Sequence, residues 1–332
     1  MSILVTGGAG YIGSHTVRKL TDIGYNVIVY DSLEKSHKES VKDIPLIVGN
    51  ILDEQLLDST MKKYNIQSVI HFAAYSLVGE SMAEPEKYYV NNVCGTVNLL
   101  KVMLNNNIKR IVFSSTAAVY GEPQEIPITE NSPKNPTNVY GKTKLMIEEI
   151  LKDYDLAYGL KYISLRYFNA CGADESGEIG EDHTPETHLM PLVLQSALGK
   201  LPEIRIFGTD YPTPDGTCIR DYIHVNDLAE AHILALEKLL ADGQSAVYNL
   251  GNGNGFSVRE VIRAAEEVVG KPIKVVEGER RPGDPAVLVA SAEKIKRELG
   301  WQPKYQGLKE IIETAWKWHQ LHPNGYNTNE NF

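Results

Sequence analysis

Short apolar runs alternate with longer amphipathic stretches through the first half of the chain. The runs at residues 3–5, 27–30, 46–48, 68–71, 111–113 and 162–166 are rich in β-branched residues and predict strands. The stretches between them predict helices at 11–23, 53–64, 86–105 and 137–158. Strands that are apolar on both faces and alternate with helices are typical of a parallel sheet covered on both sides. Right-handed crossovers then give a doubly wound, Rossmann-type α/β fold.

The pattern becomes irregular after residue 168. Residues 169–187 are polar and rich in glycine, which predicts a functional loop. Helices are expected near 191–198, 227–240, 257–269 and 308–320, with a strand at 247–250. Ser257 and Glu260 predict a capping box at the start of the third of these helices. We therefore expect a Rossmann-type domain over residues 1–170 and a smaller C-terminal α/β lobe over 171–332, with interleaved chain contributions.

Composition and charge narrow the classes of partner. The 332 residues are 42% hydrophobic and 23% charged, which allows a packed core, and the formal net charge is −10. An acidic balance argues against a nucleic-acid partner, although a local phosphate-binding cleft stays possible. No apolar run approaches the roughly 20 residues of a membrane span, and the N-terminal segment lacks a basic stretch. We expect a cytoplasmic protein without a membrane partner.

Cysteines and histidines give no metal or disulfide pattern. The three cysteines are too few and too scattered for a disulfide framework or a zinc site, and are expected to be small buried hydrophobes. His183 and His188 lie in the predicted loop, but no convincing third ligand accompanies them in the sequence. No metal is therefore expected.

Glycines at positions 7, 10 and 13 follow the first predicted strand and open the first predicted helix. Glycine permits a tight turn and close approach to a pyrophosphate, while the helix N-terminus supplies free N–H groups. The GxxGxxG spacing is a variant of the usual fingerprint, and an ordinary strand–helix turn would also suit it. Asp31 ends the second strand, where an acid binds the ribose hydroxyls of adenosine and repels a 2′-phosphate; a turn or cap is the alternative. Together these features predict NAD as the cofactor.

Tyr140 and Lys144 lie one turn apart on a predicted helix, so they share one face. An ammonium near a phenol, together with a cationic nicotinamide, favours the phenolate and makes it a usable base. Such a pair is common on solvated helices, but this one follows a strand that ends at Thr116, where ligands bind in open α/β sheets. Thr116 could hydrogen-bond the same substrate hydroxyl.

The glycine motif, Thr116 and the Tyr140/Lys144 pair resemble the extended short-chain dehydrogenase/reductase superfamily. Over nearly its whole length the chain further resembles the UDP-hexose 4-epimerases of that superfamily. The matching stretches are residues 72–74, 78–81, 91–93, 114–121, 140–144, 166–169, 189–191, 206–212, 216–225 and 280–284.

The resemblance implies roles for individual positions. Tyr140 would be the catalytic base, Lys144 its electrostatic partner and Thr116 the group that orients the hydroxyl. NAD would be bound by Gly7, Gly10, Tyr11, Ile12, Gly13, Asp31, Ser32, Asn50, Ile51, Phe72, Ala73, Ala74, Ser76, Asn91, Thr116, Tyr140, Lys144 and Phe168. The UDP-sugar would be bound by Thr116, Tyr140, Asn169, His188, Leu189, Arg205, Phe207, Arg220, Arg281, Asp284 and Leu288. Arginine suits the diphosphate because its planar fork pairs with two oxygens.

The implied reaction is the interconversion of UDP-galactose and UDP-glucose through transient oxidation at C4. Related dehydratases carry an Asp-Glu pair after the strand-end hydroxyl, whereas this chain has Ala117 and Ala118, whose methyl groups cannot transfer protons. A 4-epimerase that prefers UDP-GlcNAc, a UDP-pentose or a UDP-uronate stays open, as does a non-catalytic nucleotide-sugar-binding protein.

Four positions depart from the better-known pattern. Ser76 replaces a cofactor-contacting lysine, Asn50 replaces an aspartate near adenine and His188 replaces an asparagine. Leu288 replaces a tyrosine that crowds the sugar, which would leave room for an N-acetyl group. Relatives also pair two long helices, here 86–105 and 137–158, so a homodimer is expected.

Overall fold

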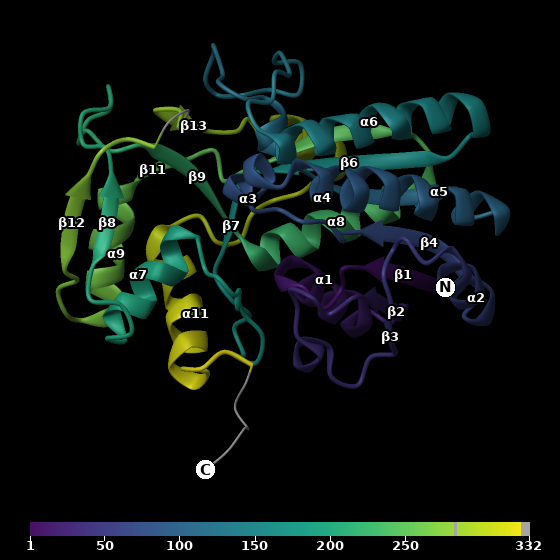
Figure 1. Ribbon diagram of the computed structural model, residues 1–332, viewed down its shortest axis with the longest axis horizontal. Helices are drawn as coiled ribbons and strands as arrows, with labels where there is room; N and C mark the ends of the chain where they lie inside the picture. The colour runs from purple at the N-terminus through teal and green to yellow at the C-terminus, as the bar shows by residue number, and fades with distance from the viewer. Residues whose placement is uncertain (282–283, 327–332) are drawn as a thin grey trace.

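Seven parallel strands form the main sheet of the computed structural model, which describes residues 1–281 and 284–326 (Figure 1). The order β10-β6-β5-β4-β1-β2-β3 reverses direction about β1 and β4, as in a doubly wound fold. The predicted fold class and all six strands predicted in the first half are therefore confirmed. The strands are β1 (Ser2–Thr6), β2 (Asn26–Asp31), β3 (Leu46–Val48), β4 (Ile66–His71), β5 (Arg110–Thr116), β6 (Lys161–Tyr167) and β10 (Ala246–Leu250).

Helices cover both faces of this sheet because alternate strand residues point to opposite sides. Ile3 and Val5 face one core and Leu4 faces the other, and all three are fully buried. The first core is closed by α1 (Tyr11–Asp22), α8 (Val225–Ala241) and α10 (Glu293–Leu299). The second core is closed by α2 (Glu54–Lys63), α5 (Gly95–Asn105) and α6 (Val139–Tyr158), which lie on the other side of the sheet in Figure 1.

One strand of this sheet and two of the helices that cover it, α8 and α10, come from the second half of the chain. Strand β10 pairs in parallel with β6 from Ala246 to Leu250, and α8 packs along α1. The sheet is therefore completed only after the chain has passed through part of the smaller lobe.

The smaller lobe lies at the carboxyl end of the sheet strands, on the left in Figure 1. Its apolar core joins three helices with buried residues of its strands. The helices are α7 (Leu189–Ala197), α9 (Val258–Val269) and α11 (Leu308–Leu321). The strands are β7 (Asn169–Cys171), β8 (Ile204–Phe207), β9 (Ile219–His224), β11 (Gly255–Ser257), β12 (Val275–Gly278) and β13 (Val287–Leu288). The capping box of Ser257 and Glu260 is confirmed at the start of α9.

The predicted helix at 86–105 is unbroken but is not α-helical throughout. It is built from α4 (Pro85–Tyr88), a π-helical segment (Tyr89–Cys94) and α5, after a separate short helix α3 (Val78–Ala83). The buried side chain of Asn92 bonds both the backbone N–H and the carbonyl of Tyr75 and also Thr143. These bonds between distant segments accompany the widened turn. Short 3-10 turns occur at Lys38–Val41 and Ala117–Val119.

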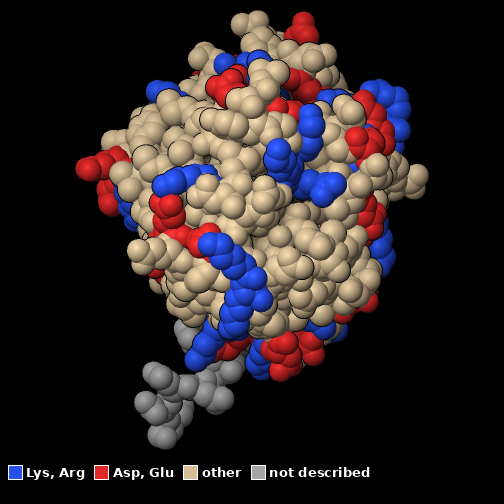
Figure 2. Space-filling view, turned by 90° about the vertical axis from the view of Figure 1, so that its right-hand side faces the viewer, with Lys and Arg blue, Asp and Glu red and all other residues tan. Residues whose placement is uncertain are grey.

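The surface carries both signs of charge. On the face shown in Figure 2, acidic side chains lie next to the basic ones across an otherwise uncharged surface. Among the described residues, none of the helices is both long and apolar enough to cross a membrane. Cys171 and Cys218 are buried as expected, whereas Cys94 is exposed at the end of the π-helical segment, so that part of the cysteine prediction is wrong.

Candidate active site

The glycine turn connects β1 to α1 and leaves no room for side chains. Gly7 has a φ of 71°, and a Cβ placed on it would lie 2.5 Å from the amide nitrogen of Ala73. A Cβ on Gly13 would lie 2.3 Å from the carbonyl oxygen of Gly7. Gly10 takes the N-cap position of α1, so no side chain covers the first N–H groups of the helix. This open, positive helix end fits a pyrophosphate.

Asp31 lies at the end of β2, almost fully buried beside the glycine turn. One carboxylate oxygen accepts a hydrogen bond from the Ala9 N–H at 2.9 Å. The other accepts bonds from the Leu33 N–H and the Ser36 hydroxyl, at 3.0 and 2.7 Å. The turn-stabilising role considered for Asp31 is therefore present in the structure. A carboxylate offers about four acceptor positions, so capacity remains for a ribose hydroxyl.

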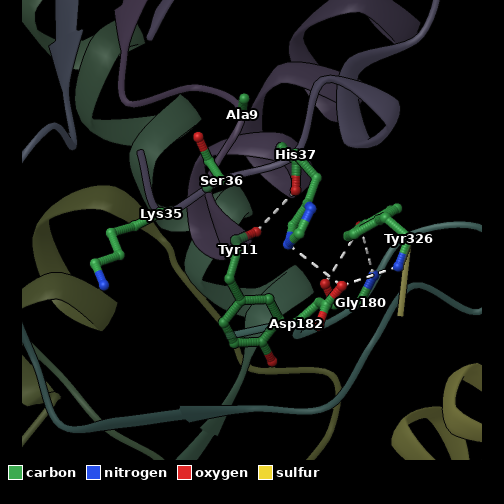
Figure 3. A pocket seen from close by; sticks show the side chains of 10 residues that line it. Ala9, Tyr11, Lys35, Ser36, His37, Gly180, Asp182 and Tyr326 are labelled. Carbon is green, nitrogen blue, oxygen red and sulfur yellow. Dashed lines mark hydrogen bonds and ion pairs between the residues drawn. The ribbon is translucent and has the colours of Figure 1, made fainter. Parts of the chain in front are cut away.

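A small pocket lies between the glycine turn and the loop that joins the two lobes (Figure 3). Its lining includes Tyr11, Lys35 and His37 from one side and Asp182 from the other. The Tyr11 hydroxyl donates to the Gly172 carbonyl at 2.6 Å. The proposed cofactor helix and this loop are thus in direct contact.

The remaining residues predicted to bind NAD come from several elements along the same edge. Phe72 and Ala73 follow β4, and both of their N–H groups donate to the Thr6 carbonyl. Ile51 packs closely against Gly95, where a Cβ would lie only 2.5 Å from it. The side chain of Asn50 accepts a bond from the Leu52 N–H at 2.9 Å. Of the others, Ile12, Ala74, Asn91 and Phe168 are partly buried, while Ser32 and Ser76 are exposed.

The three residues predicted to be catalytic are buried at the carboxyl end of β5. Thr116 ends that strand, and Tyr140 and Lys144 lie on the first turns of α6, with exposed fractions of 8%, 8% and 3%. The side chain of Asn138 caps α6 by accepting from the Gly141 N–H at 2.8 Å. A Cβ on Gly141 would lie 2.5 Å from the Ala118 carbonyl oxygen, so glycine allows α6 to approach the end of β5.

Without cofactor or substrate, burial is the main influence on the protonation of Tyr140 and Lys144. Burial raises the pKa of Tyr140, Tyr167 raises it further, and a hydrogen bond with Thr116 opposes the shift. Burial lowers the pKa of Lys144 to about 7, against an opposing effect of Glu148. The Lys144 ammonium donates to the Ser114 carbonyl at 2.7 Å and lies 6.0 Å from the centre of the Tyr140 ring. The phenol therefore keeps its proton at neutral pH until further positive charge is supplied.

A buried ion pair lies behind Lys144. Glu148, one helical turn further along α6, pairs with Arg166 of β6 at 2.5 Å, with exposed fractions of 5% and 3%. The hydroxyl of Ser115 donates to the same carboxylate at 2.5 Å. An Arg166 N–H donates to the Tyr120 hydroxyl at 2.8 Å. The sequence-based prediction does not include this network, because a glutamate on a helix and an arginine on a strand carry no signal that they pair.

The residues predicted to bind the substrate lie where the smaller lobe faces the main sheet. They form two separate groups. Asn169 donates to the Asp221 carbonyl at 3.0 Å, which joins β7 to β9. Arg220 of β9 is ion-paired with Asp284. Phe168 and Leu288 pack against one apolar cluster.

A second group lies on the outer face of β8. The Arg281 guanidinium lies 4.0 Å from the centre of the Phe207 ring. Arg205 shares this face of β8 because it is two positions from Phe207, and it is exposed. Residues 282 and 283, part of a stretch that carries the resemblance, lie outside the described residues.

His188 is partnered within its own loop. Its Nδ1 atom lies 2.6 Å from a carboxylate oxygen of Glu181, and Leu189 follows it as the first residue of α7. The structure therefore places His188 at the N-terminus of a lobe helix, with its ring already engaged.

Comparison with known proteins places the chain among enzymes that act on nucleotide sugars. Residues 3–251 match the family described as the NAD dependent epimerase/dehydratase family. A UDP-glucose 4-epimerase of Halalkalibacterium halodurans is 58% identical over 99% of this chain and 98% of its own length.

Solved structures agree over the same length. A crystal structure of a UDP-glucose 4-epimerase superimposes with a TM-score of 0.97 at 53% identity and covers 100% of both chains. The UDP-glucose 4-epimerase of Bifidobacterium longum, solved in complex with NAD+ and UDP, has a TM-score of 0.93 at 43% identity, covering 98% of this chain and 100% of its own.

Proposed function

Because the chain belongs to the NAD dependent epimerase/dehydratase family, we propose that it interconverts UDP-galactose and UDP-glucose by inverting C4 of the hexose. The observation that carries the reaction type is the buried Tyr140 beside Thr116 and Lys144. Ala117 and Ala118 follow Thr116, where elimination of water would need an acid and a base. One base and one hydride acceptor are sufficient for epimerisation.

Tyr140 acts as the base in this proposal. Its phenolate takes the proton of the 4-hydroxyl, and the Thr116 hydroxyl holds that oxygen in position by a hydrogen bond. NAD, held by the glycine turn and Asp31, would supply a positive nicotinamide ring as the reversible hydride acceptor for C4. Tyr140 then gives its proton back to the new alkoxide, so the protein ends the cycle unchanged.

Lys144 prepares Tyr140 for this step. Its side chain is buried near the phenol ring, where the positive charge that it carries when protonated has a stronger effect than in water. Because burial alone raises the pKa of Tyr140, the phenolate depends on the positive charges brought close to it.

The UDP moiety holds the substrate while the sugar turns. Arg220 and Arg281 lie on the lobe side and offer planar donor groups for diphosphate oxygens. An anchor at the nucleotide leaves the hexose free to rotate and present its other face.

The test is to incubate the purified full-length chain with UDP-galactose, without added NAD, and to measure UDP-glucose. We expect conversion to an equilibrium mixture, because the cofactor is regenerated within each cycle. Lack of conversion by protein that contains bound NAD would refute the proposal. Conversion that persists in Tyr140→Phe would refute the assignment of the base.

A wider substrate range is supported by Leu288. This residue packs beside Phe168 with an apolar cluster and is only partly buried. A leucine leaves more space than a tyrosine, which supports acceptance of the N-acetyl group of UDP-GlcNAc. We expect Leu288→Tyr to lower the rate with UDP-GlcNAc more than the rate with UDP-glucose. Equal effects on both rates would refute this second candidate.

A homodimer in the cytoplasm completes the proposal. Val90 and Val97 on the 86–105 segment and Met146 on α6 are exposed apolar residues, which supports a helix-mediated interface. All three cysteines are free, as is typical of a reducing compartment. A monomer by light scattering at micromolar concentration would refute the dimer.

A further inference from the structure

Four potential metal ligands converge in the loop between β7 and α7. These are Glu181, His183, Glu186 and His188, and each places one ligand atom within 4.8 Å of the others. No convincing third ligand accompanies the two histidines in the sequence, but the fold brings two carboxylates beside them. The loop folds back on itself, which brings both carboxylates to the imidazole rings.

Three of the four nitrogen–oxygen distances in the cluster are close to those of a tetrahedral site, and the fourth is a hydrogen bond between Glu181 and His188 that an ion would have to replace. A Glu181 oxygen lies 3.2 Å from Nδ1 of His183 and 2.6 Å from Nδ1 of His188. The Glu186 oxygens lie 3.7 and 3.4 Å from the same two nitrogens. Bonds of about 2.0–2.2 Å in a tetrahedron separate neighbouring ligand atoms by roughly 3.3–3.6 Å. Small side-chain movements would therefore bring the four donors around one ion.

The carboxylates are held in place by the surrounding structure. The side chains of Glu181 and Glu186 are only 4% and 6% exposed. One oxygen of Glu186 accepts hydrogen bonds from the N–H groups of Thr187 and His188, at 2.7 and 2.8 Å. Within the described part of the chain, Nδ1 of His183 is buried without a well-formed hydrogen bond. This nitrogen therefore faces both carboxylates at ion-pair distance without forming a hydrogen bond of good geometry to either.

We propose that Glu181, His183, Glu186 and His188 bind one divalent transition-metal ion, for which Zn²⁺ is the best match. Imidazole nitrogen combined with carboxylate oxygen suits Zn²⁺, whereas Mg²⁺ and Ca²⁺ favour sets made of oxygen alone. The two buried carboxylates balance the charge of the ion. The site uses none of Tyr140, Lys144 and Thr116 and shares only His188 with the residues expected to bind the UDP-sugar, so it extends the function beyond that proposal.

Protons compete with the ion for this site. Burial lowers the pKa of each imidazole, but the two carboxylates prevail and raise it to about 9 for His183 and about 10 for His188. Tyr11 from α1 and His319 from α11 face the same carboxylates. Zn²⁺ therefore has to displace a proton from each ring, and the carboxylates that now stabilise two imidazolium ions would stabilise the metal.

The role of this ion would be structural. The rings of Tyr11 and His183 make an edge contact with centres 6.2 Å apart, and His188 directly precedes α7. An ion at the cluster would fix the loop between the start of α1 and the start of α7. Both helix ends belong to the expected cofactor and substrate contacts.

The experiment is a titration of the full-length chain with Zn²⁺ after treatment with a chelator and its removal. We expect one ion per chain by calorimetry, and visible absorption typical of four-coordinate Co²⁺ when Co²⁺ replaces Zn²⁺. His183→Gln should weaken Zn²⁺ binding at least about tenfold, because it removes a direct ligand. His37→Gln is the matched control, since His37 pairs with Asp182 in the neighbouring pocket and contributes nothing to the cluster.

A second variant keeps the proposal testable if His183→Gln fails to fold. Glu186→Gln removes a different ligand, and Zn²⁺ should raise the melting temperature of the wild type but not of this variant. Absence of one tight site in the wild type, or equal affinity in wild type and His183→Gln, would overturn the proposal. Conversion of UDP-galactose is measured separately, so failure of either proposal is distinguishable from failure of the other.

Discussion

The two sides of the candidate active site hold their charges in different ways. On the sheet side, Glu148 and Arg166 form an ion pair that is almost fully buried. On the lobe side, Arg220 pairs with Asp284 and Arg280 with Asp210, and these pairs are partly or largely exposed. A buried pair cannot exchange its partner without a large desolvation cost, whereas an exposed arginine can exchange a carboxylate for a phosphate. The sheet side is suited to fixed chemistry and the lobe side to binding and release.

The largest expected effect is a loss of turnover, and it tests the chemistry assigned to the sheet side. Tyr140→Phe removes the proposed base but keeps the ring, so turnover of UDP-galactose should fall by about 10²–10⁴-fold. Bound NAD, released by acid and measured, should be unchanged. A variant with turnover within tenfold of the wild type would show that another group takes the proton.

The next effect tests whether the sheet side is rigid because of its buried ion pair. Glu148→Gln leaves Arg166 buried without a counter-charge, which should cost about 3–5 kcal/mol of unfolding free energy. Urea unfolding followed by circular dichroism measures this loss. The control is Glu149→Gln, an exposed neighbour on the same helix, with an expected change within about 0.5 kcal/mol. Equal effects for the two variants would contradict the comparison.

A smaller effect, on binding rather than stability, is expected on the lobe side. Arg220→Met removes charged donors that can bind the diphosphate, and should weaken UDP binding by about 1.5–3 kcal/mol. The loss of its partly exposed ion pair should cost no more than about 1 kcal/mol of stability. Calorimetry with UDP measures the first quantity. Arg280→Met, at a more exposed arginine that pairs with Asp210, should leave UDP affinity unchanged.

The last effect is a dependence of stability on pH. Burial lowers the pKa of Lys144 to about 7 from 10.5, so between these values the unfolded chain holds a proton that the folded chain has lost. The lysine's contribution therefore makes the unfolding free energy rise with pH across this window, by up to about 1.4 kcal/mol per pH unit.

Lys144→Met isolates that contribution. Unfolding of NAD-free wild type and variant at pH 7.5 and pH 9.5 should show a steeper increase for the wild type. Identical slopes would mean that Lys144 titrates in the folded protein as it does in water.

The same contrast explains what could be predicted from the sequence. Strands such as residues 3–5 are buried on both faces, so their continuous apolar runs predict a covered parallel sheet. The spacing of the glycines after the first strand predicts the glycine turn. The placement of Tyr140 and Lys144 on one face of α6 was predictable because they are one helical turn apart. The residue roles taken from the resemblance remain predictions.

Features formed by distant segments were not predictable. The π-helical segment at Tyr89–Cys94 accompanies bonds from Asn92 to Tyr75 and Thr143, which no local pattern records. Glu148 shares the face of Tyr140 and Lys144 on α6, and this spacing is the one signal that could have suggested its position. Arg166, on a strand, gave no such signal.

The pairing of β10 with β6 has a consequence for how the chain is made. Until residue 250 has left the ribosome, β6 presents an open strand edge, and α1 lacks the helix that packs along it. Synthesis of the first half alone therefore produces a sheet with an exposed apolar face, a state prone to aggregation. A gene fragment that stops near residue 170 should be insoluble, and supplying the remaining segment as a separate chain should rescue it.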